Sequence, residues 1–421
     1  MFCFLRLSTH NLIAYMKKTP LFLLIIFTHL FLGLVSAQQP FVNYTQADGL
    51  PDENVLDVAV DQNNHLWFAT QEGVARFDRS SWVVYTTHDG LASNFVNCIA
   101  IAPNGDVWAG SDAGVSRFDG TTWTSYNTSD GLLNNLVNHI AVEGDGTVWI
   151  AVTGGVSSWN DTMFTNYTVA LGLPSPMVGF VGIDDHNNKW FATWLGGVAK
   201  FDGQSFTVFN QDSGLIDNNI TTVAFDSAGN IYLGTYFGIT VLDMQGNWLR
   251  NIEHADGLYH EAVMDIVFDS GGRMWAGIFV DYLLDGGITG VADSIYYSYG
   301  MLDGLVSLLV NRLAVDHDDN IWIATGGGVS MFTGAQLSVS TLQPKPVVKV
   351  YPNPTQSLVH IEAPEIQAAD LLLTDLAGRV IMKGHMLHGR SMIDLSGMAP
   401  GLYHLIIKTP DQAVSHRIII Q

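Results

Sequence analysis

The sequence predicts an all-β protein, a seven-bladed β-propeller followed by a small C-terminal β-sandwich. The main evidence is an Asp-Gly-Leu-type triplet that recurs in steps of 41 to 47 residues, with its glycine at Gly49, Gly90, Gly131, Gly172, Gly214, Gly257 and Gly304. Eighteen residues after each glycine comes a tryptophan, or Tyr232 in the fifth copy. A fixed period of about 40 with several short strands per unit is typical of a propeller with one four-stranded blade per repeat. The 42 glycines and the charged fraction of only 14% also favour a sheet protein with many tight turns.

Residues 1–37 have the pattern of a secretory signal peptide, with Met16 as the expected true start. Lys17 and Lys18 supply a basic beginning, residues 21–35 an apolar run, and residues 35–37 (Val-Ser-Ala) a cleavage site. The apolar run is shorter than the roughly 20 residues of a membrane-spanning helix. We therefore expect an exported mature chain with no transmembrane segment.

Residues 38–340 are expected to form the propeller. In every repeat, apolar residues six and nine positions after the glycine mark the innermost strand, and an Asp/Asn/Gly-rich turn leads to the second strand with its aromatic residue. A loop then leads to the third strand, and a further turn to an outer strand such as residues 123–126. Residues 41–45 copy an outer strand but precede the first repeat, so we expect them to complete the last blade. The rival is that residues 337–340 fill that edge.

The last part of the chain differs in character. Residues 341–349 form a short linker that contains two prolines. Residues 350–421 contain alternating segments such as residues 402–407, which indicate strands of a small β-sandwich. Nothing in this segment points to catalysis.

Charge and cysteine content exclude several classes of function. The net charge is −22, and residues 41–340 hold 8 basic and 34 acidic side chains. Nucleic acids and anionic membranes are poor partners for such a surface, because both require a basic face. Cys3 lies in the signal peptide, so Cys98 has no intrachain disulfide partner. The sequence has no nucleophile elbow, zinc motif or phosphate-binding loop, so we assign no catalytic residue, metal or cofactor.

Two stretches carry a resemblance to known families. The segment Asp48-Gly49-Leu50-Pro51, with Val55, Val58, residues 64–74 (NHLWFATQEGV) and their six copies, resembles the propeller repeats in the sensor region of bacterial two-component regulators. Those sensors continue into a membrane helix and a kinase, which this chain lacks, so the resemblance implies an extracytoplasmic ligand-binding propeller and not a signal transducer. Residues 351–355 (YPNPT), 375–380, 393–395, 400–403 and 416–420 look like the C-terminal sorting domain of the type IX secretion system of Bacteroidota. This second resemblance implies contact with that secretion machinery, followed by release or attachment to the outer surface.

Comparison of the seven repeats with one another gives a first group of candidate site residues. The position eight after the glycine varies from copy to copy, as Asp57, Cys98, His139, Phe180, Thr222, Asp265 and Arg312. It neighbours an apolar position on the innermost strand, so by strand alternation it is expected to face the central channel. One interpretation is an idle, water-filled channel lining. The other is that Asp57, His139, Asp265 and Arg312 bind a ligand or carry out chemistry.

A second group lies on the loops between the second and third strands of blades four to six. Trp194, Tyr236 and Phe237, and Phe279 and Tyr282 in an enlarged loop, are aromatic residues at positions where a core does not require them. They are candidates for binding a sugar ring or an apolar side chain; the alternative is packing over the channel mouth. Two weaker signals are a calcium-loop-like segment at residues 316–320, for which a hairpin turn is the better interpretation, and His260-Glu261 as an acid/base pair.

Three functions remain open at this stage. The leading hypothesis is a secreted or cell-surface propeller that binds a glycan or peptide without catalysis. The second is a lyase or hydrolase that acts in the central channel; streptogramin-type lyases also have seven-bladed propellers, so only the fold favours this hypothesis. The third is a protein–protein adhesion scaffold.

Overall fold

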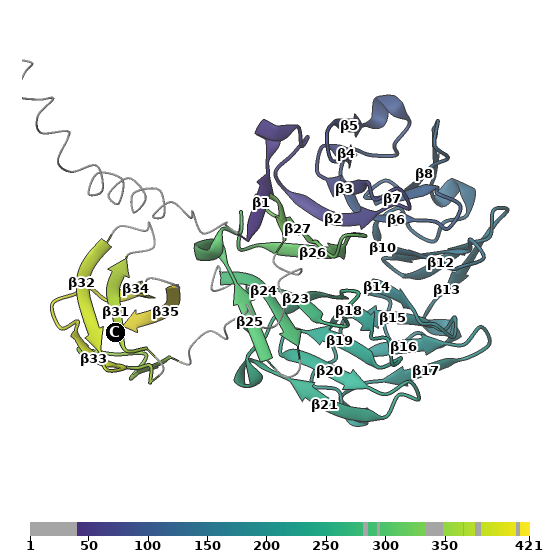
Figure 1. Ribbon diagram of the computed structural model, residues 1–421. Helices are drawn as coiled ribbons and strands as arrows, with labels where there is room; N and C mark the ends of the chain where they lie inside the picture. The colour runs from purple at the N-terminus through teal and green to yellow at the C-terminus, as the bar shows by residue number, and fades with distance from the viewer. Residues whose placement is uncertain are drawn as a thin grey trace, which may run out of the picture. The chain divides into compact units, whose positions relative to one another are not determined.

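The computed structural model describes residues 40–280, 285–292, 295–333, 348–364, 366–374, 380–409 and 413–421. The expected signal peptide at residues 1–37 lies outside these residues, as do residues 341–347 of the expected linker. No α-helix occurs in the described residues, and none of their helical turns is long and apolar enough to cross a bilayer. Seven four-stranded sheets form a ring in which the strand that follows each repeat glycine lies innermost (Figure 1). The innermost strands of neighbouring sheets contact one another all the way around, including β26 (Val310–Val315) with β2 (Val55–Val60), so the ring is closed.

All seven blades are antiparallel meanders, numbered here in chain order. Blades 1 to 3 consist of β2 (Val55–Val60), β3 (Leu66–Thr70), β4 (Gly73–Phe77) and β5 (Trp82–Tyr85); β6 (Val96–Ile101), β7 (Val107–Ser111), β8 (Val115–Phe118) and β9 (Trp123–Tyr126); and β10 (Val137–Val142), β11 (Val148–Val152), β12 (Gly155–Trp159) and β13 (Phe164–Tyr167). Blades 4 and 5 consist of β14 (Val178–Ile183), β15 (Lys189–Thr193), β16 (Val198–Phe201) and β17 (Phe206–Phe209); and β18 (Ile220–Phe225), β19 (Ile231–Thr235), β20 (Gly238–Leu242) and β21 (Trp248–Ile252). Blade 6 consists of β22 (Val263–Phe268), β23 (Met274–Val280), β24 (Asp285–Ala292) and β25 (Ile295–Tyr299), and blade 7 contains β26, β27 (Ile321–Thr325) and β28 (Gly328–Phe332).

The fourth strand of blade 7 comes from the start of the chain. Strand β1 (Phe41–Tyr44) pairs antiparallel with β28, with Phe41 opposite Phe332 and Tyr44 opposite Val329. The Phe41 ring packs 5.1 Å from Phe332, which buries it in the core of the last blade. This confirms the predicted closure of the ring by residues 41–45. The rival segment, residues 337–340, lies outside the described part of the chain.

The repeated glycine triplet builds the connection from each outer strand to the next blade. A single 3-10 turn precedes the glycine in every repeat: η1 (Gln46–Asp48), η2 (Thr87–Asp89), η3 (Thr128–Asp130), η4 (Val169–Leu171), η5 (Gln211–Ser213), η6 (His254–Asp256) and η8 (Met301–Asp303). The glycine has a positive φ, which is 121° at Gly49, and there a Cβ atom would lie 2.6 Å from Cδ1 of Trp82. Glycine is therefore needed both for the backbone conformation and for the close approach of the outer strand.

The aromatic residue of each second strand fills the space between blades, and in every blade except blade 2 a hydrogen bond to a carboxylate anchors it. Trp67, Trp190, Trp275 and Trp322 each donate from Nε1 to the aspartate six residues earlier, at 2.7 to 3.0 Å. These large side chains are almost completely buried. Burial of an indole ring contributes strongly to stability when its N–H group has a partner, so the repeat specifies both the core and its polar anchor.

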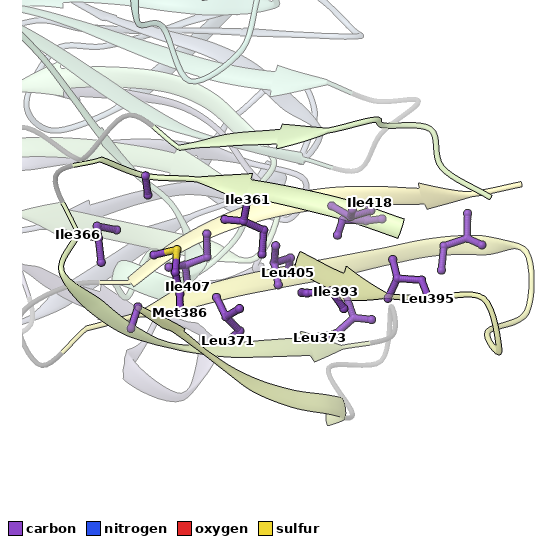
Figure 2. Packing of buried hydrophobic residues seen from close by; sticks show 14 residues of the cluster. Ile361, Ile366, Leu371, Leu373, Met386, Ile393, Leu395, Leu405, Ile407 and Ile418 are labelled. Atoms are coloured by element: carbon purple, nitrogen blue, oxygen red, sulfur yellow. The ribbon is translucent and has the colours of Figure 1, made fainter. Parts of the chain in front are cut away.

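The C-terminal residues form one curled seven-stranded sheet. In spatial order its strands are β29 (Lys349–Tyr351), β30 (Leu358–Glu362), β33 (Arg390–Asp394), β32 (Val380–Leu387), β31 (Ala368–Thr374), β34 (Gly401–Lys408) and β35 (Ala413–Ile420). Only the pair Leu387–Arg390 joins β32 to β33, so three strands fold over the other four in the manner of a sandwich. Figure 2 shows that Ile361 and Ile393 from one side meet Leu371, Leu405 and Ile418 from the other. This core contains aliphatic and thioether side chains and is independent of the propeller cores.

Candidate functional site

The variable position eight residues after each glycine lies on the innermost strand, next to a β-bulge. In six described strand pairs the register shifts between the apolar residue six after the glycine and this position, as between Val55 and Asp57 and between Val310 and Arg312. The same shift separates Val96 from Cys98. A bulge reorients the side chain that follows it. The seven side chains consequently gather at the axis of the ring, as the contacts below establish.

Arg312 connects members of this group that lie on opposite sides of the ring. Its guanidinium lies over the Phe180 ring of blade 4, 5.2 Å from the ring centroid. Phe180 in turn stacks on His139 of blade 3, with centroids 3.8 Å apart. Nη1 of Arg312 also donates to the carbonyl oxygen of Met264 at 3.0 Å. A single long side chain therefore spans the axis and closes the channel at this level.

The two carboxylates of the group tie neighbouring blades together. Asp57 accepts hydrogen bonds from the backbone N–H groups of Val58 at 2.8 Å and of Ile99 in the next blade at 2.9 Å. Asp265 accepts from the N–H of Leu313 in the next blade at 2.9 Å and from Thr222 Oγ1 at 2.8 Å. Both oxygens of each carboxylate are therefore engaged within the protein.

His139 has the same role in blade 3, because its Nδ1 accepts the N–H of Val181 at 3.3 Å. Burial, together with the Arg312 guanidinium, holds the pKa of His139 well below its usual range, so the imidazole is neutral at neutral pH. Burial also raises the pKa of Cys98 well above its usual value, which keeps the thiol protonated and unreactive.

Burial raises the pKa of Asp57 to about 7, although Arg312 and two backbone N–H groups act in the opposite direction. Burial also raises the pKa of Asp265, again opposed by Arg312. The structure thus brings Asp57, His139, Asp265 and Arg312 together, as the repeat comparison predicted. It differs from the prediction in that the two carboxylates are buried and all four side chains are hydrogen-bonded to other groups of the protein, in place of lining an open channel. The reason is the reach of Arg312, which the strand pattern does not specify.

The second candidate region lies on the face of the ring that carries the 3-10 turns. Trp194 and Tyr236, on adjacent loops, meet edge to face with ring centroids 6.4 Å apart. The backbone N–H of Trp194 donates to the carbonyl oxygen of Met177 at 3.0 Å, which places the loop between β15 and β16 beside the connection that enters blade 4. Phe237 projects next to Tyr236 and is 58% exposed. Trp194, Tyr236 and Phe237 therefore lie on one accessible face, as predicted.

This face has further exposed apolar residues that the sequence analysis missed. They include Phe95, Leu136, Met177 and Leu195, which are 39% to 71% exposed. Phe95, Leu136 and Met177 all stand five residues after the repeat glycine, where blades 1 and 5 have asparagine. The signal was present as an apolar column ahead of the innermost strand in blades 2 to 4. Together with Trp194, Tyr236 and Phe237, these residues are called the apolar face below.

The enlarged loop of blade 6 differs from the expectation. Phe279 lies within β23 and is half-buried, because β23 and β24 extend their pairing through Phe279–Gly286 and Val280–Asp285. Its N–H donates to the carbonyl oxygen of Ala262 at 3.1 Å. Phe279 is thus part of a lengthened hairpin and not of a loop. Tyr282 lies outside the described residues.

The weaker sequence signals give ordinary structural features. Residues 316–320 form a hairpin turn in which Asp316 accepts the N–H groups of Asp318 and Asn320, both at 2.9 Å. No group of three or more His, Cys, Asp or Glu side chains in the described residues is arranged to hold a metal ion. The His260 Nδ1 and Glu261 Oε2 atoms are 3.9 Å apart, and the same Nδ1 accepts the Glu261 N–H at 2.8 Å.

Models of known protein families match segments of the propeller and the C-terminal domain. Residues 49–72, 90–113 and 214–237 match the two component regulator propeller family, and residues 349–421 match the secretion system C-terminal sorting domain. A search of the curated proteins gave no match.

Several solved structures share the fold at low sequence identity. The extracellular domain of BT3049 from B. thetaiotaomicron, described as a hybrid two component system, is 19% identical with a TM-score of 0.65 over 91% of this chain and 57% of that one. PorZ, a surface component of the type IX secretion system of Porphyromonas gingivalis, is 16% identical with a TM-score of 0.56 over 88% of this chain and 60% of that one. A streptogramin B lyase is 11% identical with a TM-score of 0.57 over 69% of this chain and 96% of that one.

The chain thus spans less than two thirds of the length of the first two of these proteins. At these identities the likeness concerns the fold. The sorting domain indicates export to the cell surface or beyond, through contact with the secretion machinery. The protein is therefore a seven-bladed propeller built of two component regulator propeller repeats and ending in a secretion system C-terminal sorting domain.

Proposed function

We propose that this exported propeller is a non-catalytic binding protein whose apolar face takes up a basic peptide segment with apolar side chains. The observation that carries the proposal is the apolar face itself, seven exposed side chains gathered on the loops of blades 2 to 5. A group of exposed apolar side chains on one face of an exported protein is typical of a recognition surface.

The chemistry of the patch favours a peptide over a glycan. Sugar-binding sites combine stacked rings with polar side chains that bind hydroxyl groups. Among the seven side chains only Trp194 and Tyr236 have a polar atom, and burial raises the pKa of Tyr236, with the Asp217 charge adding to the effect, so its phenol stays protonated. Leu136, Met177 and Leu195 offer nothing but apolar surface. Such a surface suits leucine, phenylalanine or methionine side chains of a partner.

The charge around the patch favours a basic partner. The described loops on this face contain no lysine or arginine. Outside the 3-10 turns, the loops of blades 1, 2, 5 and 6 carry acidic residues, such as Asp52, Asp112, Asp217 and Glu261, whereas those of blades 3, 4 and 7 do not. The loops are residues 45–54, 71–72, 86–95, 112–113, 127–136, 153–154, 168–177, 194–197, 210–219, 236–237, 253–262, 300–309 and 326–327. A face with one sign of charge attracts and orients a partner of the opposite sign. Binding is therefore expected to weaken as the salt concentration rises.

The axial cluster is the alternative location for activity, and its geometry argues against catalysis. A general acid or base must reach a substrate atom within hydrogen-bond distance. Asp57 and Asp265 have both oxygens bonded to protein groups, and the guanidinium of Arg312 covers the axis. We assign the cluster to ring stability.

A binding screen with the full chain tests the proposal. It compares an array of basic apolar peptides with a glycan array, and wild type with Trp194→Ala. Trp248→Ala is the matched control, because Trp248 is similarly exposed, at 51% against 47%, on the outer strand β21. We expect peptide binding that Trp194→Ala weakens about tenfold or more and that Trp248→Ala preserves. Binding to glycans alone, or peptide binding that Trp194→Ala leaves intact, would contradict the proposal.

A further inference from the structure

Blade 2 differs from the other six blades at one position of the repeat, where those six blades all have a carboxylate with the same hydrogen bond. Twelve residues after the glycine the other blades have a carboxylate, which accepts a hydrogen bond from the aromatic residue six positions later; the acceptors are Asp61, Glu143, Asp184, Asp226, Asp269 and Asp316. In blade 2 this position is Ala102. The aromatic residue is present, as Trp108, but its usual acceptor is missing.

The backbone around Ala102 is the same as in the other blades. Its N–H donates to the carbonyl oxygen of Asp106 at 2.8 Å, as that of Asp61 does to His65 at 2.9 Å. In blade 1 the Asp61 carboxylate also accepts the N–H of Asn63 at 2.8 Å. Blade 2 therefore lacks only a side chain, and its loss removes the acceptor for two donors.

These two donors are Nε1 of Trp108 and the N–H of Asn104, the counterpart of Asn63. No described residue accepts a hydrogen bond from Trp108 Nε1, and Trp108 is only 2% exposed. Trp108 and Asn104 line a cavity of about 160 Å³ between blades 2 and 3, together with Ala102 and Arg117. The Trp108 N–H group faces this cavity, so a ligand that supplies an acceptor at this point gains a hydrogen bond that no described protein group makes.

The other residues that line the cavity determine which class of ligand can supply this hydrogen-bond acceptor. Arg117 donates from Nε to Asp106 at 2.6 Å and from Nη1 to Asp161 at 2.8 Å. Asp145 lines the opposite side, and a hydrogen bond from the Thr147 N–H keeps its pKa below the usual value, so it is ionised at neutral pH. The cavity thus holds three carboxylates and one guanidinium. An anion alone is disfavoured there, whereas a ligand that brings a positive charge beside its acceptor is not.

We propose that this cavity binds a small zwitterionic α-amino acid. Its carboxylate takes the place that an aspartate or glutamate carboxylate takes in the other blades, and accepts from Trp108 Nε1 and the Asn104 N–H. Its ammonium group binds the carboxylates of Asp145 and Asp161. The volume suits a small amino acid, since a cavity of about 150 Å³ holds a six-membered ring. The cavity is formed by the turns on the other face of the ring from the apolar face, so this site is independent of the peptide-binding proposal.

The test follows the Trp108 indole N–H signal by NMR in the full chain labelled at tryptophan. The probes are alanine and glycine, with acetate, ethylamine and methyl glucoside as comparisons. Alanine and glycine are expected to shift one indole signal, with a dissociation constant on the order of 1 mM for so few atoms. Acetate lacks the ammonium group and ethylamine lacks the carboxylate, so each is expected to bind at least about tenfold more weakly than alanine.

Ala102→Asn provides the matched variant. Its amide oxygen is positioned to accept from Trp108, and its NH₂ group to donate to Asp106, so the side chain fills the cavity without adding charge. Alanine binding is expected to disappear in this variant and to persist in Trp194→Ala, on the other face. Acetate binding as tight as alanine would overturn the assignment, as would binding of methyl glucoside alone. An indole signal that no amino acid shifts, or binding that survives in Ala102→Asn, would overturn it too.

Discussion

The axial cluster predicts a pH dependence of stability that one substitution should remove. Asp57 has a pKa of about 7 in the folded protein against 3.8 for an ordinary aspartate, chiefly because it is buried. Between these two pH values the folded chain holds a proton at Asp57 that the unfolded chain has released. Stability from this residue is therefore complete below pH 3.8 and is lost as the pH rises to about 7. At about 1.4 kcal/mol per pH unit, the loss amounts to roughly 4 kcal/mol.

Asp57→Asn isolates this contribution because the amide does not ionise. The amide oxygen can keep one of the two backbone N–H groups, those of Val58 and Ile99, and losing the other costs about 1–2 kcal/mol at every pH. The difference in unfolding free energy between wild type and Asp57→Asn should therefore change with pH in favour of the variant, by roughly 4 kcal/mol from pH 4 to pH 7. Other titrating groups, such as His139 with its lowered pKa, largely cancel in the difference.

Urea unfolding followed by tryptophan fluorescence measures this difference. All 11 tryptophans precede residue 341, so the signal reports on the propeller and not on the C-terminal domain. Asp265→Asn serves as a parallel case, since burial raises its pKa in the same direction. A difference between wild type and Asp57→Asn that stays constant from pH 4 to pH 7 would refute the reasoning.

Three further substitutions test the ring. Arg312→Met removes a cation that lies close to both axial carboxylates and should destabilise the propeller by about 3–5 kcal/mol at pH 8, and by less at pH 5 where the Asp57 carboxyl is protonated; an equal loss in urea unfolding at both pH values would speak against the charge argument. Phe41→Ala should lower the unfolding free energy by about 3–5 kcal/mol, because the ring is buried in blade 7. The neighbouring Val42 is 41% exposed, so Val42→Ala should change the unfolding free energy little. Similar effects of the two substitutions would contradict closure by β1. Gly73→Ala should cost about 2 kcal/mol or more, since φ is 123° and a Cβ would lie 2.3 Å from the Tyr85 carbonyl oxygen; an unchanged thermal midpoint would disprove this steric account.

Much of the fold could be predicted because the repeat carries redundant information. Seven glycines and seven aromatic residues in fixed order specify the number of blades, and residues 41–45 resemble an outer strand closely enough to predict the closure. The side chains at the variable position, eight residues after each glycine, could be predicted to point toward the axis because the alternation of side chains along a strand is a local property. Burial of that column was not, because it depends on the radius of the ring and on how far the Arg312 side chain extends across it.

Residues on loops were harder to predict than residues on strands. Trp194 and Tyr236 were found because aromatic side chains stand out in short loops, whereas Leu136 looks like an ordinary core residue until its place before the strand is known. Phe279 was assigned to a loop because the length of the blade 6 hairpin is not visible in the repeat spacing. The cavity at Ala102 escaped notice for the opposite reason: a missing carboxylate has no signal except by comparison with six copies that have it.

The origin of β1 has a consequence for how this protein is made and exported. A chain that has emerged only as far as residue 300 contains six complete sheets and one strand near its beginning with no partner, because β28 ends at Phe332. The seam can form only once residues 328–332 have emerged, so the final joining step cannot begin before more than three quarters of the chain has been made or has crossed a membrane. Until that moment the early segment exposes an unpaired strand edge, which is open to pairing with another chain.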